Sequence, residues 1–206
     1  MKKWSASSLR STKFPESVPL LSYDIPSGSA GNINVFGEGA QPISMLLLAV
    51  DQDYARVYNI ILESGIFLSR EGEPTPGNVV LNESAARLLG WENPVGKTIH
   101  LGAFAGMPLK IVGMVKDFHF ESLKQSIDPL VIAGLNEPFT RSYRYFSLKL
   151  NTKNPSQSIA SIGELWSKIF PEAGFEYKFM DDDSGRCTRM KKNSNQQHRS
   201  PRVYAC

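Results

Sequence analysis

The feature that most constrains the fold is the central part of the chain, where short apolar runs alternate with turn signals. The apolar run Val79–Leu81 leads into Asn82, whose side chain can cap a helix by accepting a backbone N–H. A helix-like stretch, Glu83–Leu89, comes next, and the turn Asn93–Gly96 follows it. Two strand-like runs come after this turn, the second of them Leu109–Val115. The pattern predicts short strands and short helices in alternation.

Elements of the same kind are expected on both sides of this block. Val18–Tyr23 is a short strand candidate, and the continuous apolar run Ile43–Val50 is typical of a buried strand. Asp51 is then the expected N-cap of a short helix. Near the C-terminal end, Asn154 precedes a proline and predicts the start of an amphipathic helix, Pro155–Phe170.

Two further strands flank this last helix. Phe175–Met180 alternates aromatic and other side chains, and Tyr143–Leu150 alternates in the same way. In the second case one face carries Tyr145, Ser147 and Lys149, and the other carries Phe146, Leu148 and Leu150. Overall we expect an α+β structure.

Charge is unevenly distributed along the 206 residues. The net charge is +3, but six basic residues and no acidic residue follow Asp183, which leaves −3 on the preceding part. The basic balance is therefore poor evidence for nucleic-acid binding by the folded body. Residues 184–206 are polar, basic and aperiodic, which predicts a disordered tail. The tail is either non-native sequence or a basic segment that contacts a membrane surface.

Cysteine content and hydropathy add two limits. Cys187 and Cys206 both lie in the tail, and a body without cysteine suits an oxidising compartment, as well as the cytoplasm. The longest apolar run, Met45–Val50, is far shorter than the roughly 20 residues that a membrane-spanning helix needs.

Gly96-Lys97-Thr98 has the ending of a phosphate-binding loop, but the rest of that motif is missing. Trp91 stands where the first glycine is required, and Pro94 removes a backbone N–H from the site that would hold the phosphates. The structural interpretation is a turn with Gly96 at a positive φ angle.

Asp117 and His119 are two residues apart, so on a strand they would share one face. They could bind a metal or serve a hydrolase, but a metal site needs three or four ligands and no third is evident nearby. Hydrogen bonds at the end of a strand are the simpler expectation. Asp181–Asp183 is either a weak cation site or a solvated strand end. Neither Ser84 nor Ser122 has the setting of a nucleophile, and we expect no catalytic residue, metal or cofactor.

Three motifs in a fixed order carry a family resemblance. They are LNESAARLLG from Leu81, NPVGKTI from Asn93 and IVGMVKDFHFESL from Ile111. In this order they resemble the extracytoplasmic (periplasmic) core domain of MacB/FtsX-type ABC-transporter permeases. The resemblance covers roughly residues 18–183.

This resemblance implies a core domain over residues 1–183, made of two small mixed subdomains. One subdomain would combine residues 18–62 with 143–183, and the other would be a β-rich insertion over 65–138. It also implies a non-catalytic domain on the outer side of the bacterial inner membrane, excised here from an integral membrane protein.

By the same resemblance, the domain would couple ATP-driven motion of transmembrane helices to substrate export, lipoprotein handling or a periplasmic partner. The implied partners are a second permease protomer, a cytoplasmic ABC ATPase that hydrolyses the ATP, and a periplasmic adaptor or lipoprotein. Expected partner contacts lie in exposed loops, at Ser27, Asn32, Trp91, Glu92 and Asn93, although Trp91 could instead belong to the core. The alternative is a free-standing soluble module that binds a ligand between the two subdomains.

Overall fold

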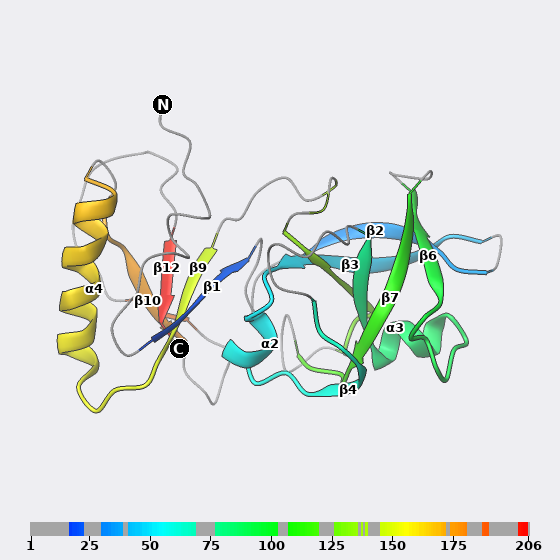
Figure 1. Cartoon of the computed structure of the whole chain (residues 1–206), viewed down its shortest axis with the longest axis horizontal. Coiled ribbons are helices and arrows are strands. Elements are labelled where there is room, and N and C mark those ends of the chain that lie inside the picture. Colours follow the sequence, from blue (N-terminus) through cyan, green and yellow to red (C-terminus); the bar gives the residue numbers. More distant parts are fainter. Residues whose placement is uncertain are drawn as a thin grey trace.

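The computed structural model consists of two parts that lie side by side along the longest axis of the molecule (Figure 1). It describes residues 17–22, 30–38, 41–68, 77–102, 107–119, 126–135, 137, 139, 145–171, 174–180, 187–189 and 202–205. Strands dominate over helices in both parts, which confirms the expected mixture of α and β structure.

The larger part, which we term the central half, is built around a closed sheet. Strands follow one another in space as β3, β2, β6, β7, β5 and β8, and β8 pairs again with β3, so that the six close on themselves. Strand β4 adds to the second half of β7. The strands are β2 (Gly31–Phe36), β3 (Ile43–Val50), β4 (Leu62–Gly65), β5 (Asn78–Asn82), β6 (Thr98–Leu101), β7 (Pro108–Val115) and β8 (Leu130–Gly134), and the helices are α2 (Tyr54–Val57) and α3 (Glu83–Leu88).

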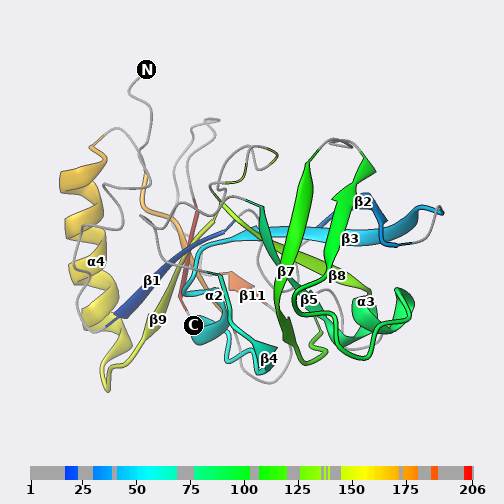
Figure 2. The ribbon, with the colours of Figure 1, turned by 45° about the vertical axis from the view of Figure 1, so that its right-hand side comes forward.

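Alternating side chains of the closed sheet form two cores. Inward residues of all six strands fill its interior, among them Met45, Leu81 and Leu101. The residues between them, such as Leu48 and Ile132, point outward and pack with α2. Figure 2 shows β7 crossing β3.

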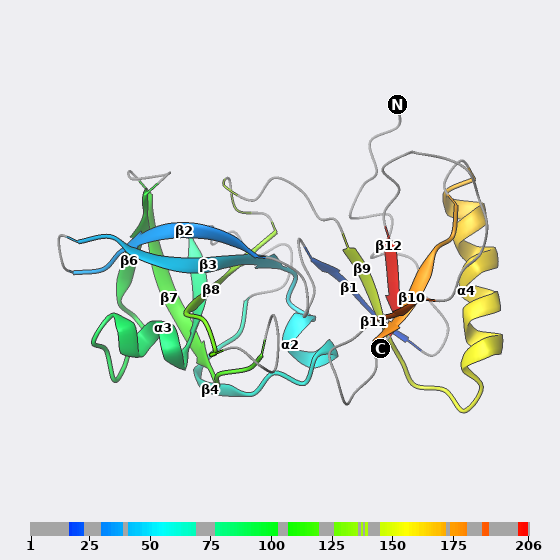
Figure 3. The ribbon, with the colours of Figure 1, turned by 180° about the vertical axis from the view of Figure 1, so that it is seen from behind.

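The smaller part, the end half, is one sheet covered by one helix. Its strands lie in the order β11, β10, β12, β9 and β1, and Figure 3 shows α4 beside β10 and β12. The bounds are β1 (Ser17–Ser22), β9 (Tyr145–Leu150), α4 (Pro155–Ile169), β10 (Tyr177–Met180), β11 (Cys187–Arg189) and β12 (Arg202–Ala205). Its core consists of Phe146, Leu148, Ile162 and Trp166.

Most local expectations from the sequence are confirmed. Strand β3 has the expected bounds, and α4 begins where Asn154 Oδ1 accepts a hydrogen bond from the backbone of Gln157. The expected N-cap at Asp51 is wrong. Asp51 Oδ1 accepts a hydrogen bond from the backbone of Asp53 two residues later, which forms a turn and delays the start of α2 to Tyr54.

The C-terminal segment differs from the disordered tail that we expected. Strand β12 inserts between β9 and β10, parallel to both, and β11 pairs with β10. These two strands are held by backbone hydrogen bonds to neighbouring strands. The expectation of disorder considered only side-chain burial and so did not include them. The other residues of 184–206 lie outside the described residues.

The packing also differs from the expected grouping of residues 18–62 with 143–183. Val35 and Met45 of β2 and β3 lie in the same core as Val79, Leu109 and other residues of the central segment. Of the N-terminal strands, β1 pairs along its whole length with β9. Its contact with β3 is the single pair Ser22 and Val50.

Candidate functional site

The first sequence motif holds together the base of the closed sheet. Asn82 Oδ1 accepts hydrogen bonds from the backbone N–H of Ala85 (3.0 Å) and of Leu130 (2.9 Å), and Asn82 Nδ2 donates to Asp128 O (2.9 Å). The side chain is almost fully buried. Asn82 therefore caps α3 as predicted and also fixes the entry to β8.

The first and third motifs bind each other. Asp117, just after β7, accepts hydrogen bonds from Ser84 N (2.8 Å) and Ser84 Oγ (2.7 Å) at the start of α3. Glu83 Oε2 in turn accepts from the backbone N–H of Asp117 (2.9 Å). Arg87 lies 3.5 Å from the Asp117 carboxylate. The hydrogen-bonding role expected for Asp117 is confirmed, and its two carboxylate oxygens serve α3.

His119 does not join Asp117 in a site. Its side chain is exposed, whereas Phe118 packs on the outer core. In the part of the chain that the structure describes, no group of three or more His, Cys, Asp or Glu side chains could hold a metal ion. Three of the positions discussed above lie outside the described residues: Phe120, Ser122 and the run Asp181–Asp183.

The second motif forms a turn whose backbone donors are already used. Gly96 has φ +90°, as predicted, and its N–H donates to Ile111 O (2.7 Å), while Lys97 N–H donates to Pro94 O (3.1 Å). Lys97 Nζ lies 2.9 Å from Glu38 Oε1 and 5.0 Å from the centre of the Trp91 ring. The turn thus presents structural hydrogen bonds and a surface ion pair.

The expected partner-contact residues do not form one cluster. Trp91 is half-buried against the inner core, whereas Glu92 and Asn93 beside it are exposed. Asn32 is exposed on β2, five residues before Gly37, which lies against Trp91. That spacing separates Asn32 from the turn by about 16 Å along the strand. Ser27 lies outside the described residues.

One buried carboxylate lies near the start of β5. Both oxygens of Glu137 accept from Gly77 N at 2.9 Å. Burial raises the pKa of Glu137 above its usual value of 4.5, and hydrogen bonds from the backbone N–H groups of Gly77 and Asn78 partly oppose this. The interaction anchors the chain where it enters the closed sheet.

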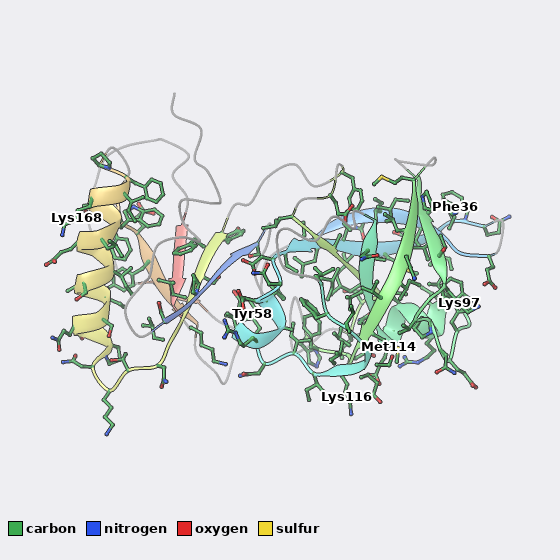
Figure 4. The ribbon with its side chains drawn as sticks, viewed as in Figure 1. Phe36, Tyr58, Lys97, Met114, Lys116 and Lys168 are labelled. Atoms are coloured by element: carbon green, nitrogen blue, oxygen red, sulfur yellow. The ribbon has the colours of Figure 1, made fainter. Side chains whose placement is uncertain are left out.

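A polar junction joins the two halves. Tyr58 Oη and Ser147 Oγ share a hydrogen bond of 2.8 Å. Lys149 Nζ donates to Asn59 Oδ1 (2.6 Å) and to Arg56 O (3.2 Å). Figure 4 shows Tyr58 at α2, between the strands of the end half and the closed sheet. Alternation along this strand predicts that Ser147 and Lys149 share one face, but it does not indicate what that face contacts.

The family comparison agrees with the three motifs. Residues 5–162 match the family model of the MacB-like periplasmic core domain. The chain belongs to this family. It is the family of periplasmic domains of ABC-transporter permeases, which the resemblance implied. No curated protein matches the sequence. Among the described residues, no helix has the length and hydropathy needed to cross a membrane.

Three solved structures share the fold of this MacB-like domain. The periplasmic region of MacB from Actinobacillus actinomycetemcomitans has a TM-score of 0.58 and 19% identity, over 80% of this chain and 72% of that chain. The extracellular domain of the noncanonic ABC-type transporter YknZ from Gram-positive bacteria has a TM-score of 0.55 and 13% identity, over 79% and 80%. A domain of a putative permease protein from Porphyromonas gingivalis has a TM-score of 0.56 and 14% identity, over 93% and 85%.

Proposed function

We propose that this domain couples motion of transmembrane helices to work on the outer side of the membrane. ATP hydrolysis on a separate cytoplasmic ATPase drives the helices, and a second permease protomer completes the transporter. The work is export of a substrate, handling of a lipoprotein or action on a periplasmic partner. The family membership supports a permease domain, and the geometry of the end half supports coupling.

The observation that carries the proposal is the pairing of β1 with β9. Six residue pairs, from Ser17 with Leu150 to Ser22 with Tyr145, hold these strands together. One strand precedes the central half in the sequence and the other follows it. Membrane segments joined before β1 and after β12 would therefore both act on the end half, and a pull on either would move one sheet.

The central half is suited to move as a rigid body. Its six strands close on themselves, and its interior is filled by fully buried side chains such as Leu81, Ile99 and Leu109. A closed and packed sheet deforms little, because close packing leaves few alternative arrangements. Motion of the end half would therefore change the angle between the two halves, while the central half keeps its own shape.

No residue in this proposal has a catalytic role. The carboxylate of Asp117 is engaged with α3, and the turn at Gly96 uses its N–H groups internally. The partner contacts that we propose are Asn32, Glu92 and Asn93 on the central half, with Trp91 beside them. We also propose Ser27, which lies outside the described residues.

A cross-linking experiment in the intact permease tests the coupling. The full-length protein is reconstituted with its ATPase in vesicles, and Asn59 and Lys149 are replaced by cysteines joined by a short bifunctional maleimide. We expect ATP hydrolysis to continue while movement of substrate stops, because the link fixes one half to the other. The matched control joins Glu38→Cys to Lys97→Cys, two neighbours within the central half.

The proposal is supported if transport stops with the Asn59–Lys149 link and continues with the Glu38–Lys97 link. If the link across the halves also leaves transport unchanged, relative motion of the halves is not part of the transport cycle, and the coupling mechanism is wrong.

A further inference from the structure

We propose that the polar face of β9 and the end of α2 form a clasp that opens and closes, and so determines whether the two halves move together. This inference rests on the proposed coupling function. It assigns a role to Tyr58, Asn59, Ser147 and Lys149, which none of the family motifs contains.

The two faces of β9 contact different halves of the domain. Phe146 and Leu148 are fully buried and pack with Trp166 of α4 in the core of the end half. Ser147 and Lys149 lie on the other face, because successive side chains of a strand point to opposite sides. They contact α2 and the residues just after it, which belong to the central half. The strand is therefore shared between a core and a polar contact.

The polar contact is sheltered and its donors and acceptors match. Ser147 is fully buried, and its hydroxyl meets the Tyr58 hydroxyl at 2.8 Å. The Lys149 ammonium group bridges the Asn59 side chain and the Arg56 carbonyl. Asn59 has φ +54°, a left-handed conformation that asparagine tolerates better than most residues. This conformation ends α2 where Lys149 reaches it.

Polar bonds of this kind can be released without loss of a hydrophobic core. Each of the three hydrophobic clusters takes the buried residues of its helices and strands from one half only. A hydroxyl or ammonium group that leaves its partner gains bonds with water, so the net free-energy change is small. The halves can therefore separate at the clasp while each core stays intact.

The remaining link between the halves is narrow enough to act as a pivot. Among the described strands, β1 and β3 pair only through Ser22 and Val50. Leu135 N–H donates to Val50 O at 3.1 Å at the same place. The chain passes between the halves after β1 and again after β8. Opening the clasp would also separate α2 from β1, which lie against each other. The connections at Val50 would then remain as the axis of rotation.

Distance measurements on the full 206-residue chain test the clasp. Cys187 and Cys206 are first replaced by serine. Spin labels are placed at Lys168→Cys on α4 and at Glu92→Cys beside the distal turn, both exposed positions. Pulsed electron resonance then gives the distribution of distances between the two halves, with and without Tyr58→Phe and Lys149→Met.

Tyr58→Phe removes one hydrogen bond and should shift the ratio of open to closed molecules about fivefold. Lys149→Met removes two exposed hydrogen bonds and should shift the ratio in the same direction by about the same factor or more. Tyr58→Phe keeps the ring and Lys149→Met keeps most of the side-chain length, so both variants should fold. The double variant should broaden the distribution further. Lys97→Met, which removes an ion pair within the central half, is the matched control.

The clasp is refuted if the distances stay the same in both variants, or if Lys97→Met broadens them equally. A second label pair within the central half, Glu92→Cys with Lys116→Cys, must stay unchanged throughout. Because these measurements need neither ATPase nor membrane, they can fail while the cross-linked transporter still shows coupling. If instead the distances change as expected and the cross-linked transporter keeps its transport, the clasp exists but transport does not depend on it.

Discussion

The two halves of the domain achieve stability in different ways. The central half closes six strands around one core and covers a second core on the outside. The end half has one sheet, one helix and a core of four buried side chains. The described parts of all three sequence motifs lie in the central half, where the first binds the third through Ser84 and Asp117 and the second binds the third through Gly96 and Ile111. The motifs therefore mark the closed sheet, whereas the residues of the proposed clasp lie outside them.

This contrast predicts that the halves unfold separately, and the largest effect should come from Trp166→Ala. Trp166 is fully buried and contacts Phe146, Phe170 and Phe175. Its removal should cost about 3–5 kcal/mol. Native-state hydrogen exchange should show β9 and α4 losing protection, while β5 and β7 keep theirs.

The control for this variant is Ser167→Ala, one residue away on the exposed face of α4. Its hydroxyl bonds only to the Gly163 carbonyl of its own helix, so the change should stay within about 0.5 kcal/mol. If Trp166→Ala lowers protection equally in both halves, the domain is one cooperative unit and the contrast is wrong.

The next largest effect should come from Gly113→Ala in the central half. A Cβ at Gly113 would overlap Ile66 O, just after the end of β4, which pairs with β7. Relief of that overlap requires a backbone shift and should cost about 3 kcal/mol. The urea midpoint should fall, with the loss of protection centred on β4 and β7.

Gly134→Ala provides the matched control, because it is also a strand glycine of the central half. A Cβ there would meet nothing within 4 Å. It should leave the midpoint nearly unchanged. Equal destabilisation by both alanines would show that loss of glycine flexibility, and not the close approach of Ile66 to β7, lowers the urea midpoint.

A smaller effect is expected for Asp117→Ala, which removes the bond between the first and third motifs. Ser84 N–H and Oγ lose their acceptor, so the free energy of unfolding should fall by about 1–2 kcal/mol, as for a lost helix cap. Lys116→Ala, which removes an exposed pair with Glu63, should change it by less than about 0.5 kcal/mol. A neutral Asp117→Ala would mean that the motif serves something other than stability.

Local features of the fold could be predicted from the sequence because their causes are local. The continuous apolar run of β3, the cap at Asn82 and the start of α4 at Asn154 depend on neighbouring residues. The closure of the sheet could not be predicted, because Leu46 of β3 pairs with Leu130 of β8 across a long separation. Alternation along a strand shows which side chains share a face, but it does not identify what that face contacts.

The same limit applied to the candidate site. The alternation of β9 puts Ser147 and Lys149 on one face, yet only the structure places them against α2 and the residues after it. Among the proposed contacts, Trp91 and Glu92 are adjacent in sequence and differ in burial, since Trp91 turns toward Gly37 and the inner core. Such differences depend on tertiary packing, which residue type alone does not determine.

The smallest expected effect concerns Glu137 and depends on pH. Because the folded-state pKa of Glu137 is raised above 4.5, the folded protein binds a proton in a pH range where the unfolded chain does not. Relative to Glu137→Gln, the wild type should therefore gain stability as the pH falls through the folded-state pKa, and this gain should be complete only below the usual pKa of 4.5. Parallel urea titrations of both proteins from pH 8 to below pH 4.5 measure the difference. A difference that is constant across this range would show that the bonds from Gly77 offset burial, and one that favours the wild type at high pH would show that they outweigh it.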